Sequence, residues 1–136
     1  MSHGMETIKT VWTNGCFDVL HRGHLELFKF AQSFGERLIV GVDTDDRVRG
    51  SKGPERPYNN LQDRVAMLKA IRFIDEVKVF GTDAELEDQI VLCDAKIIVI
   101  GSDYKNKKII GKNLVDKIIF YDRISKYSTT KILNGL

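Results

Sequence analysis

Two histidines lie three residues apart in the stretch Thr13-Asn14-Gly15-Cys16-Phe17-Asp18-Val19-Leu20-His21-Arg22-Gly23-His24. An apolar, β-rich run precedes this stretch and a helical pattern follows it, so His21 and His24 stand where a strand passes into a helix. A helix amino terminus offers unpaired N–H groups to a phosphate, and Gly15 and Gly23 let the backbone approach a ligand closely. Imidazole N–H groups also donate hydrogen bonds to phosphoryl oxygens. These residue types therefore predict a site for a phosphorylated ligand.

Other roles fit the same histidines. A histidine at a helix start can be a cap or a hydrogen-bonded group of the core. Two histidines at positions i and i+3 can bind a metal, but a third ligand at suitable spacing is absent from the neighbouring sequence. The pattern G-x-x-x-x-G-K-[ST] does not occur, which excludes a Walker phosphate loop.

The elements that must position this stretch alternate between strands and helices. Apolar runs predict strands at residues 10–13, 38–42, 77–80, 97–100 and 117–121. Helical spacing predicts helices over about residues 23–34, over about 61–72, and from the Thr82–Glu85 capping box onward, with Cys93 in the core. The run at 97–100 is continuously apolar, as in a parallel strand covered on both faces. The pattern predicts an α/β fold, a single Rossmann-like three-layer domain with a parallel sheet of about five strands.

Polar residues after the second predicted strand extend the candidate site. Residues 50–60 hold both prolines and no apolar periodicity, which predicts a surface loop of the kind that carries function in small domains. Asp43 and Asp45 are typical turn residues, but they face the ligand edge, so Asp45 is a candidate acceptor or metal ligand. Trp12, inside the first strand, is predicted to lie in the core.

Length and composition limit the class of protein. The 136 residues suit one domain, and a net charge of +2 does not indicate a nucleic-acid or membrane partner. Cys16 and Cys93 fit neither a disulfide framework nor a zinc site, and no apolar run approaches the roughly 18 residues of a membrane span, so we expect a cytoplasmic protein. Residues 1–4 read as a cloning remnant ahead of a domain over residues 5–136.

Two motifs resemble those of a known family. The Asn14-to-His24 stretch resembles the HxGH signature of the cytidylyltransferase-like nucleotidyltransferases, and Tyr127-Ser128-Thr129-Thr130 resembles their ISTT-type segment at the start of the final helix. The resemblance covers nearly all of residues 9–133. Residues 51–57, 101–104 and 109–111, together with Arg64, look most like the adenylyltransferase half of bacterial ADP-heptose synthase. Glycerol-3-phosphate cytidylyltransferase is similar mainly at the two ends.

The resemblance implies a reaction and assigns residues to it. A phosphorylated small molecule would attack the α-phosphorus of a nucleoside triphosphate carried with Mg²⁺, and pyrophosphate would leave. The resemblance implies catalytic roles for His21, His24, Lys52 and Arg123. It implies substrate-binding roles for Lys52 and Arg64, and the position of Asp45 at the ligand edge adds Asp45 to this candidate set. It implies nucleotide-binding roles for Asn14, Gly15, Cys16, Phe17, Asp18, Gly23, Asp103, Tyr104, Ser128, Thr129 and Thr130. It also implies a homodimer.

The identity of the substrates is open at this point. We expect ATP and a sugar phosphate such as a heptose 1-phosphate. Ser102 replaces a glycine usual in the heptose enzymes, and Ser125-Lys126 stands where the family often has Glu-Gly. The alternatives are a cytidylyltransferase that uses CTP and glycerol 3-phosphate, an adenylyltransferase like FAD synthetase, and a non-catalytic nucleotide-binding module. Loss of a signature histidine would favour the module, and both histidines are present.

Overall fold

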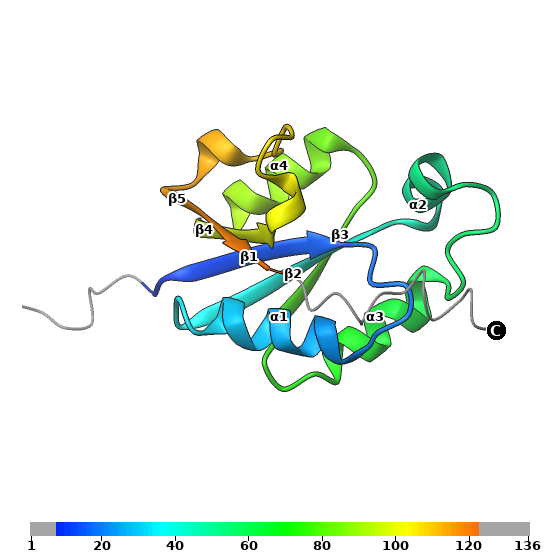
Figure 1. Ribbon diagram of the computed structural model, residues 1–136, viewed down its shortest axis with the longest axis horizontal. Coiled ribbons are helices and arrows are strands. Elements are labelled where there is room, and N and C mark those ends of the chain that lie inside the picture. Colours follow the sequence, from blue (N-terminus) through cyan, green and yellow to red (C-terminus); the bar gives the residue numbers. More distant parts are fainter. Residues whose placement is uncertain (1–7, 123–136) are drawn as a thin grey trace, which may run out of the picture.

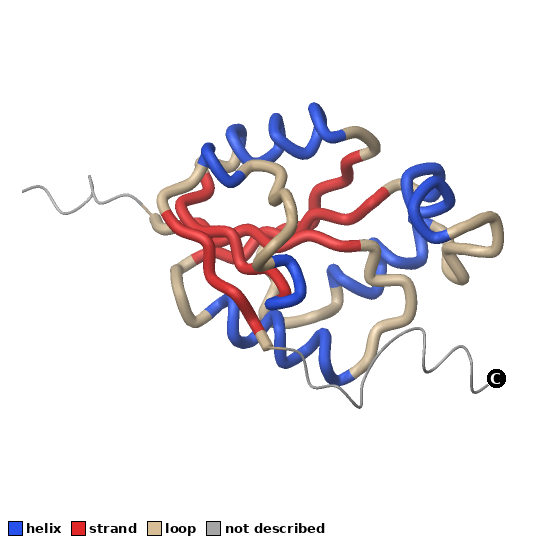
Figure 2. Tube along the Cα trace, turned by 45° about the horizontal axis from the view of Figure 1, so that its top comes forward, coloured by secondary structure: helices blue, strands red, loops and turns tan. Residues whose placement is uncertain are grey.

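The computed structural model describes residues 8–122, and its centre is a parallel sheet of five strands in the order β3-β2-β1-β4-β5. The strands are β1 (Thr10–Gly15), β2 (Arg37–Asp43), β3 (Glu76–Phe80), β4 (Ala95–Gly101) and β5 (Lys117–Tyr121). Each neighbouring pair is parallel. Helices cover both faces of the sheet (Figures 1 and 2). The predicted three-layer, Rossmann-like α/β fold is confirmed.

The helices are α1 (Arg22–Gln32), α2 (Asp45–Lys52), α3 (Leu61–Lys69) and α4 (Asp83–Leu92), with short 3₁₀ turns η2 (Ser102–Tyr104) and η3 (Lys112–Leu114). Helix α2 is absent from our prediction, and the loop predicted over residues 50–60 is wrong for its first three residues, which belong to α2. The reason is that α2 buries only Val48, so it has no apolar stripe. Its start is stabilised instead by Thr44, whose hydroxyl accepts a hydrogen bond from the Arg47 N–H at 3.3 Å.

The strands bury side chains on both faces, which explains their continuous apolar runs. On one face, side chains such as Val11, Leu38 and Val99 pack with α1 and α3 residues. On the other face, Trp12 and Ile98 pack with α4 residues. Helices α1 and α3 lie below the sheet and α4 above it in Figure 1. The apolar stripe that predicted each helix therefore faces a layer of strand side chains.

Trp12 is fully buried, as predicted, and its place depends on a glycine in the next strand. A Cβ atom on Gly41 would lie 2.3 Å from the Trp12 Cζ2 atom.

Cys93 was predicted to lie in the core. It packs against the apolar cluster that contains Trp12 and Ile98, but it is only half-buried, because it is the C-cap of α4 and not a residue within the helix. Burial raises the pKa of the Cys93 thiol.

The strand order creates a crevice at the carboxyl ends of the strands. Strand β1 is followed along the chain by β2 on one side, whereas β4 lies on the other side of β1. The connections that leave β1 and β4 therefore run in opposite directions along the sheet. Open α/β sheets bind ligands where the strand order reverses in this way, which here is between β1 and β4. The histidine stretch begins at the end of β1 and leads into α1.

We predict that Gly41→Ala destabilises the protein by roughly 1–3 kcal/mol, because the added methyl overlaps the Trp12 ring. Gly50→Ala is the matched control, since a Cβ at Gly50 in α2 meets no atom within 4 Å. The control should be neutral or more stable by up to about 1 kcal/mol. Urea denaturation of the variants measures both changes, and equal stability of the two would contradict the packing argument.

Candidate active site

A cavity of about 690 Å³ lies at the carboxyl ends of the strands, which is a volume suited to a nucleotide. Its walls come from the end of β1, the start of α1, α2, the end of β4, and the segment between η2 and η3. Sequence-predicted residues in its lining are Asn14, Gly15, Cys16, Phe17, His21, Gly23, His24, Lys52 and Tyr104. The fold thus gathers most of the predicted site residues within the described chain at one place.

The two histidines cap α1 and cap each other. His21 is the N-cap residue, and its Nδ1 accepts a hydrogen bond from the Gly23 N–H at 3.1 Å. The Nδ1 of His24 accepts from the His21 N–H at 3.2 Å, and the ring centroids lie 3.9 Å apart. Because each Nδ1 is an acceptor, the neutral rings carry their proton on Nε2. The structure shows the capping role, and a phosphate-donor role would use the other nitrogen, so it is compatible with the cap and stays a prediction.

The loop between β1 and α1 has an uncommon backbone conformation at Phe17, whose φ is 47°. The Phe17 side chain is buried and meets the His24 ring edge-on at 5.5 Å and the Phe28 ring at 5.2 Å. A Cβ on Gly15 would lie 3.2 Å from the Phe17 ring. Packing of one aromatic side chain therefore holds the strained loop and supports the His24 ring.

Asp18 joins this loop to the loop before α3. Its carboxylate is fully buried and accepts hydrogen bonds from Arg56 Nε at 2.8 Å, Tyr58 N at 2.7 Å and Asn59 N at 2.8 Å. Burial on its own raises the pKa of Asp18, but the hydrogen bonds from Asn59, Tyr58 and Arg56 outweigh it and hold the pKa below its ordinary value. Asp18 was predicted to bind nucleotide. In the structure its carboxylate is bonded to these loop donors, and Asp18 does not line the cavity, whereas Cys16 and Phe17 do.

Cations predominate among the charged side chains that the structure describes around the cavity. Arg47, Lys52, Arg56 and Lys108 line it, and Asp43 is the carboxylate among them. Arg47 donates to Asp43 Oδ1 at 3.0 Å and lies over the Phe80 ring. Burial raises the pKa of Asp43, and this effect outweighs the attraction of Arg47. Arg47 also pairs with Asp83, and Arg56 pairs with Asp18, so the positive charge that suits a phosphorylated ligand comes mainly from Lys52 and Lys108.

Some of the predicted site residues do not line the cavity, and others lie outside residues 8–122. Asp45 is ion-paired with Arg64, and neither residue belongs to the cavity lining. Asp103 is exposed in η2 and is not a lining residue either. Asn14 lines the cavity while its Oδ1 accepts from the Trp12 indole at 2.8 Å. The predicted residues Arg123, Ser128, Thr129 and Thr130 lie outside the described residues.

Sequence reasoning missed several lining residues. Arg47 lies in α2, which we did not predict because Val48 is its only buried residue. Tyr121 ends β5 at the carboxyl edge of the sheet, where a parallel strand delivers its last residue to a ligand site. Lys108 belongs to a basic run that reads as a solvated surface, and only the tertiary structure brings it to the cavity.

The class of protein follows from a family comparison that agrees with this fold and cavity. The cytidylyltransferase-like family model matches residues 12–135. The chain therefore belongs to the cytidylyltransferase-like family. Across residues 8–122, no helix is long and apolar enough to span a membrane, and no cluster of three or more His, Cys, Asp or Glu side chains could hold a metal ion.

Particular relatives extend the comparison. The chain is 40% identical over 128 residues to "Bifunctional protein HldE" of Helicobacter hepaticus (strain ATCC 51449 / 3B1), which covers 94% of this chain and 26% of the relative. The protein of the same name from Campylobacter jejuni (strain RM1221) is 41% identical over 128 residues, or 94% of this chain and 28% of the relative. The chain thus spans about a quarter of the length of these curated relatives.

A solved structure supports the fold. The lipopolysaccharide core biosynthesis protein from Thermoplasma volcanium GSS1 matches with a TM-score of 0.71 at 22% identity, over 85% of this chain and 98% of that chain. At this level of identity the match bears on the arrangement of strands and helices.

We predict that Asp18→Asn costs about 3 kcal/mol of stability near neutral pH, because Arg56 loses its buried partner. The pKa of Asp18 is lowered from 3.8, so its contribution is present above that value and is lost as the pH falls through the lower, folded-state value. The stability difference between the wild type and the variant should therefore be constant above about pH 5 and shrink in more acidic solution.

The control for this measurement is Asp88→Asn at an exposed position of α4, which should change stability by less than about 0.5 kcal/mol. Urea denaturation at a series of pH values measures both variants. A difference for Asp18→Asn that does not depend on pH would contradict the assignment of an ionised, hydrogen-bonded carboxylate.

Proposed function

We propose that this chain transfers a nucleoside monophosphate from a nucleoside triphosphate, with ATP preferred, to a phosphorylated sugar such as a heptose 1-phosphate, with release of pyrophosphate. The observation that carries the proposal is the reciprocally capped histidine pair at the start of α1. It opens on a cavity whose charged side chains are mostly cationic. Family membership supports the reaction class.

The proposed chemistry needs positioning and charge neutralisation. A phosphate oxygen of the acceptor attacks the α-phosphorus, and the bond from that phosphorus to the bridging oxygen breaks as pyrophosphate leaves. The acceptor oxygen is already an anion, so no general base and no covalent enzyme intermediate are required. His21 and His24 would donate from Nε2 to phosphoryl oxygens, where negative charge increases in the transition state. Lys52 and Lys108 would attract the two anionic substrates into one cavity.

The family resemblance adds Arg123 and residues 128–130 to the proposed site. Arg123 would add a further cation, and Ser128 and Thr129 would bind the phosphate tail of the nucleotide. Mg²⁺ fits the proposal as a companion of the nucleotide, because this ion usually binds through substrate phosphates with one or two protein carboxylates. When bound to the phosphate oxygens, the ion would neutralise part of their charge.

The preference for ATP and a sugar phosphate rests on likeness to the relatives named HldE and on the segments at residues 51–57 and 101–104. Tyr104 and the apolar side chains of Ile109 and Ile110 line the part of the cavity that follows β4. A base would fit such a wall by stacking and apolar contact. A homodimer and a cytoplasmic location stay predictions from the sequence.

We predict that His21→Asn separates the cap from the catalysis. An asparagine side chain can still accept from the Gly23 N–H and cap α1, but it removes the Nε2 donor. Stability should stay within about 1 kcal/mol of the wild type, whereas kcat should fall about a hundredfold. His24→Ala should lower kcat to a similar degree. Full activity in either variant would contradict the proposed roles, and stability and pyrophosphate release measure the two effects separately.

The nucleotide preference is tested with the four common nucleoside triphosphates, a panel of sugar 1-phosphates, and glycerol 3-phosphate. We expect kcat/KM for ATP to exceed that for CTP by about tenfold or more, because an unpaired polar group in a base pocket costs roughly 1–3 kcal/mol. Pyrophosphate release is the readout. Turnover with CTP and not ATP would overturn the nucleotide preference, and ATP binding without turnover on any acceptor would favour a binding module.

A further inference from the structure

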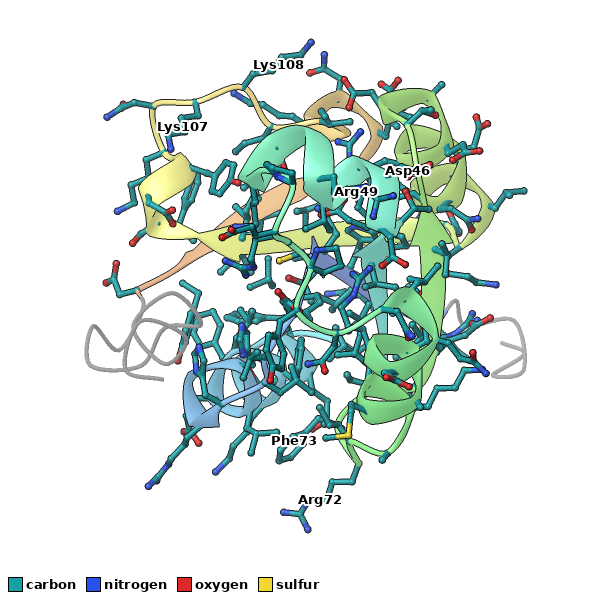
Figure 3. All side chains as sticks on the ribbon, turned by 90° about the vertical axis from the view of Figure 1, so that its right-hand side faces the viewer. Asp46, Arg49, Arg72, Phe73, Lys107 and Lys108 are labelled. Atoms are coloured by element: carbon teal, nitrogen blue, oxygen red, sulfur yellow. The ribbon has the colours of Figure 1, made fainter. Side chains whose placement is uncertain are left out.

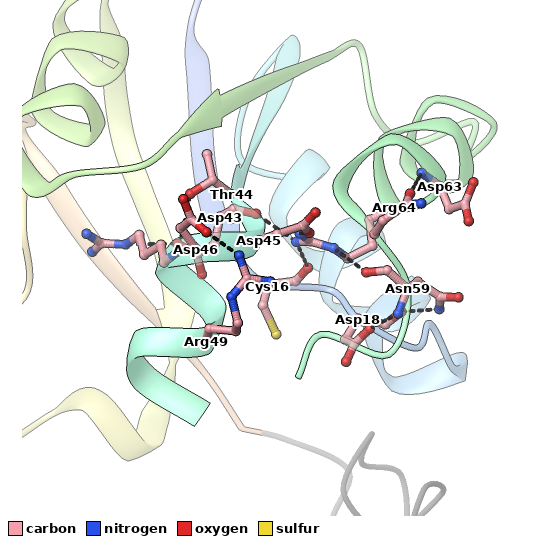
Figure 4. Close-up of polar contacts among 12 residues, drawn as sticks. Cys16, Asp18, Asp43, Thr44, Asp45, Asp46, Arg49, Asn59, Asp63 and Arg64 are labelled. Carbon is pink, nitrogen blue, oxygen red and sulfur yellow. Dashed lines mark hydrogen bonds and ion pairs between the residues drawn. The ribbon is translucent and has the colours of Figure 1, made fainter. Parts of the chain in front are cut away.

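Arg64, on α3, is one of the largest fully buried side chains in the described chain, with 1% of the residue exposed. A buried guanidinium is costly unless its charge is paired and its N–H groups are bonded. Figure 4 shows the side chain reaching from α3 toward Asp45 and the Cys16 backbone. The resemblance predicted that Arg64 binds substrate, yet it is not among the residues that line the cavity.

The donors of Arg64 end on protein oxygens. Nη1 donates to the carbonyl oxygens of Cys16 at 2.9 Å and Asp43 at 2.7 Å. Nη2 donates to Asp45 Oδ1 at 2.6 Å, and Nε donates to the Asn59 carbonyl oxygen at 3.0 Å. An arginine has five N–H donors in a planar fork, so these bonds take up most of its capacity. Little remains for a ligand.

The acceptors belong to separate segments that meet only in the folded chain. Cys16 comes directly after β1, Asp43 ends β2, and Asn59 comes directly before Asn60, the N-cap of α3. Asp45 is the first residue of α2. One side chain therefore joins the carboxyl ends of two adjacent strands to the loop before α3.

Each of these segments leads to a side chain of the cavity. The segment that starts at Cys16 leads to the histidines of α1, and the α2 segment carries Lys52. The loop that ends at Asn59 carries Arg56. Asn59 also donates from Nδ2 to the Asp18 carbonyl oxygen at 2.6 Å, so the bonds continue into the histidine loop. This network therefore connects the histidine loop with the segments that carry Lys52 and Arg56.

We propose that Arg64 is a positioning residue, which holds the histidine loop at a set separation from α2 and the Arg56 loop without contacting substrate. The inference rests on the proposed function for its catalytic consequence, because a transfer between two bound phosphates is sensitive to small displacements. A lysine at this position would keep the charge but would lack the planar fork that reaches all three segments.

The first test uses the protein without ligand, so it does not depend on the proposed reaction. Hydrogen–deuterium exchange is compared for the wild type, Arg64→Met, Arg64→Lys and the control Arg72→Met. Arg72 is exposed and points outward at the end of the molecule opposite Lys107 and Lys108 (Figure 3). We expect exchange to rise about tenfold or more at residues 16–24 and 58–60 in both Arg64 variants, with strand β4 unchanged.

The outcomes of this test are distinct. Faster exchange confined to the two loops supports the positioning role. A uniform rise along the chain in Arg64→Met means general unfolding, and the milder Arg64→Lys then decides between a local and a uniform change. A uniform rise in Arg64→Lys, or no change in either variant, would overturn the proposal. Arg72→Met should exchange like the wild type.

The second test uses the reaction, on variants shown to be folded at the assay temperature. A positioning role predicts that Arg64→Lys lowers kcat by about tenfold or more while KM for the nucleotide and the acceptor changes less than about threefold. A raised KM for one substrate with unchanged kcat would overturn the proposal and restore the substrate-binding role. If the wild type itself releases no pyrophosphate, the proposed function fails, and the exchange experiment alone decides whether Arg64 holds the loops.

Discussion

Burial of the central strands on both faces is the constraint on which the rest of this structure depends. Strands β1, β2 and β4 carry apolar side chains toward α1 and α3 on one face and toward α4 on the other. These apolar faces leave little room for polar functional groups, so the polar side chains of the site lie at the ends of the strands. The reversal of strand order beside β1 then decides which carboxyl ends open into a cavity. The position of the site follows from how the core is packed.

A cavity at strand ends needs loops of defined shape, and this protein holds its loops with buried charge. Asp18 receives donors from the loop before α3, and Arg64 donates to segments that follow β1 and β2. Buried ion pairs add little net stability, because desolvation offsets the attraction between the charges. Their directional hydrogen bonds nevertheless define one arrangement of the loops. The charged residues beneath the cavity thus contribute geometry more than stability.

Several features were predictable from the sequence because they depend on residues near one another in the chain. The five strands and the helices α1, α3 and α4 follow from apolar periodicity over short windows. The place of His21 and His24 at a strand-to-helix junction follows from the same pattern. Trp12 in the core follows from its place in an apolar strand. Family membership follows from signature motifs, which are also local.

Other features were decided only by the tertiary structure, since they join residues that are distant in sequence. Arg64 meets Cys16 across 48 positions and Asp45 across 19, and no local pattern separates such a buried arginine, with most of its donors bonded, from a substrate-binding one. Lys108 belongs to a basic run of ordinary surface composition until the fold places it beside the cavity. Helix α2 has one buried residue and a single cap to mark it. The sequence determined where strands, helices and the histidine pair lie because hydrophobic periodicity acts locally, whereas packing across the sheet decided which charged side chains line the cavity and which hold the loops.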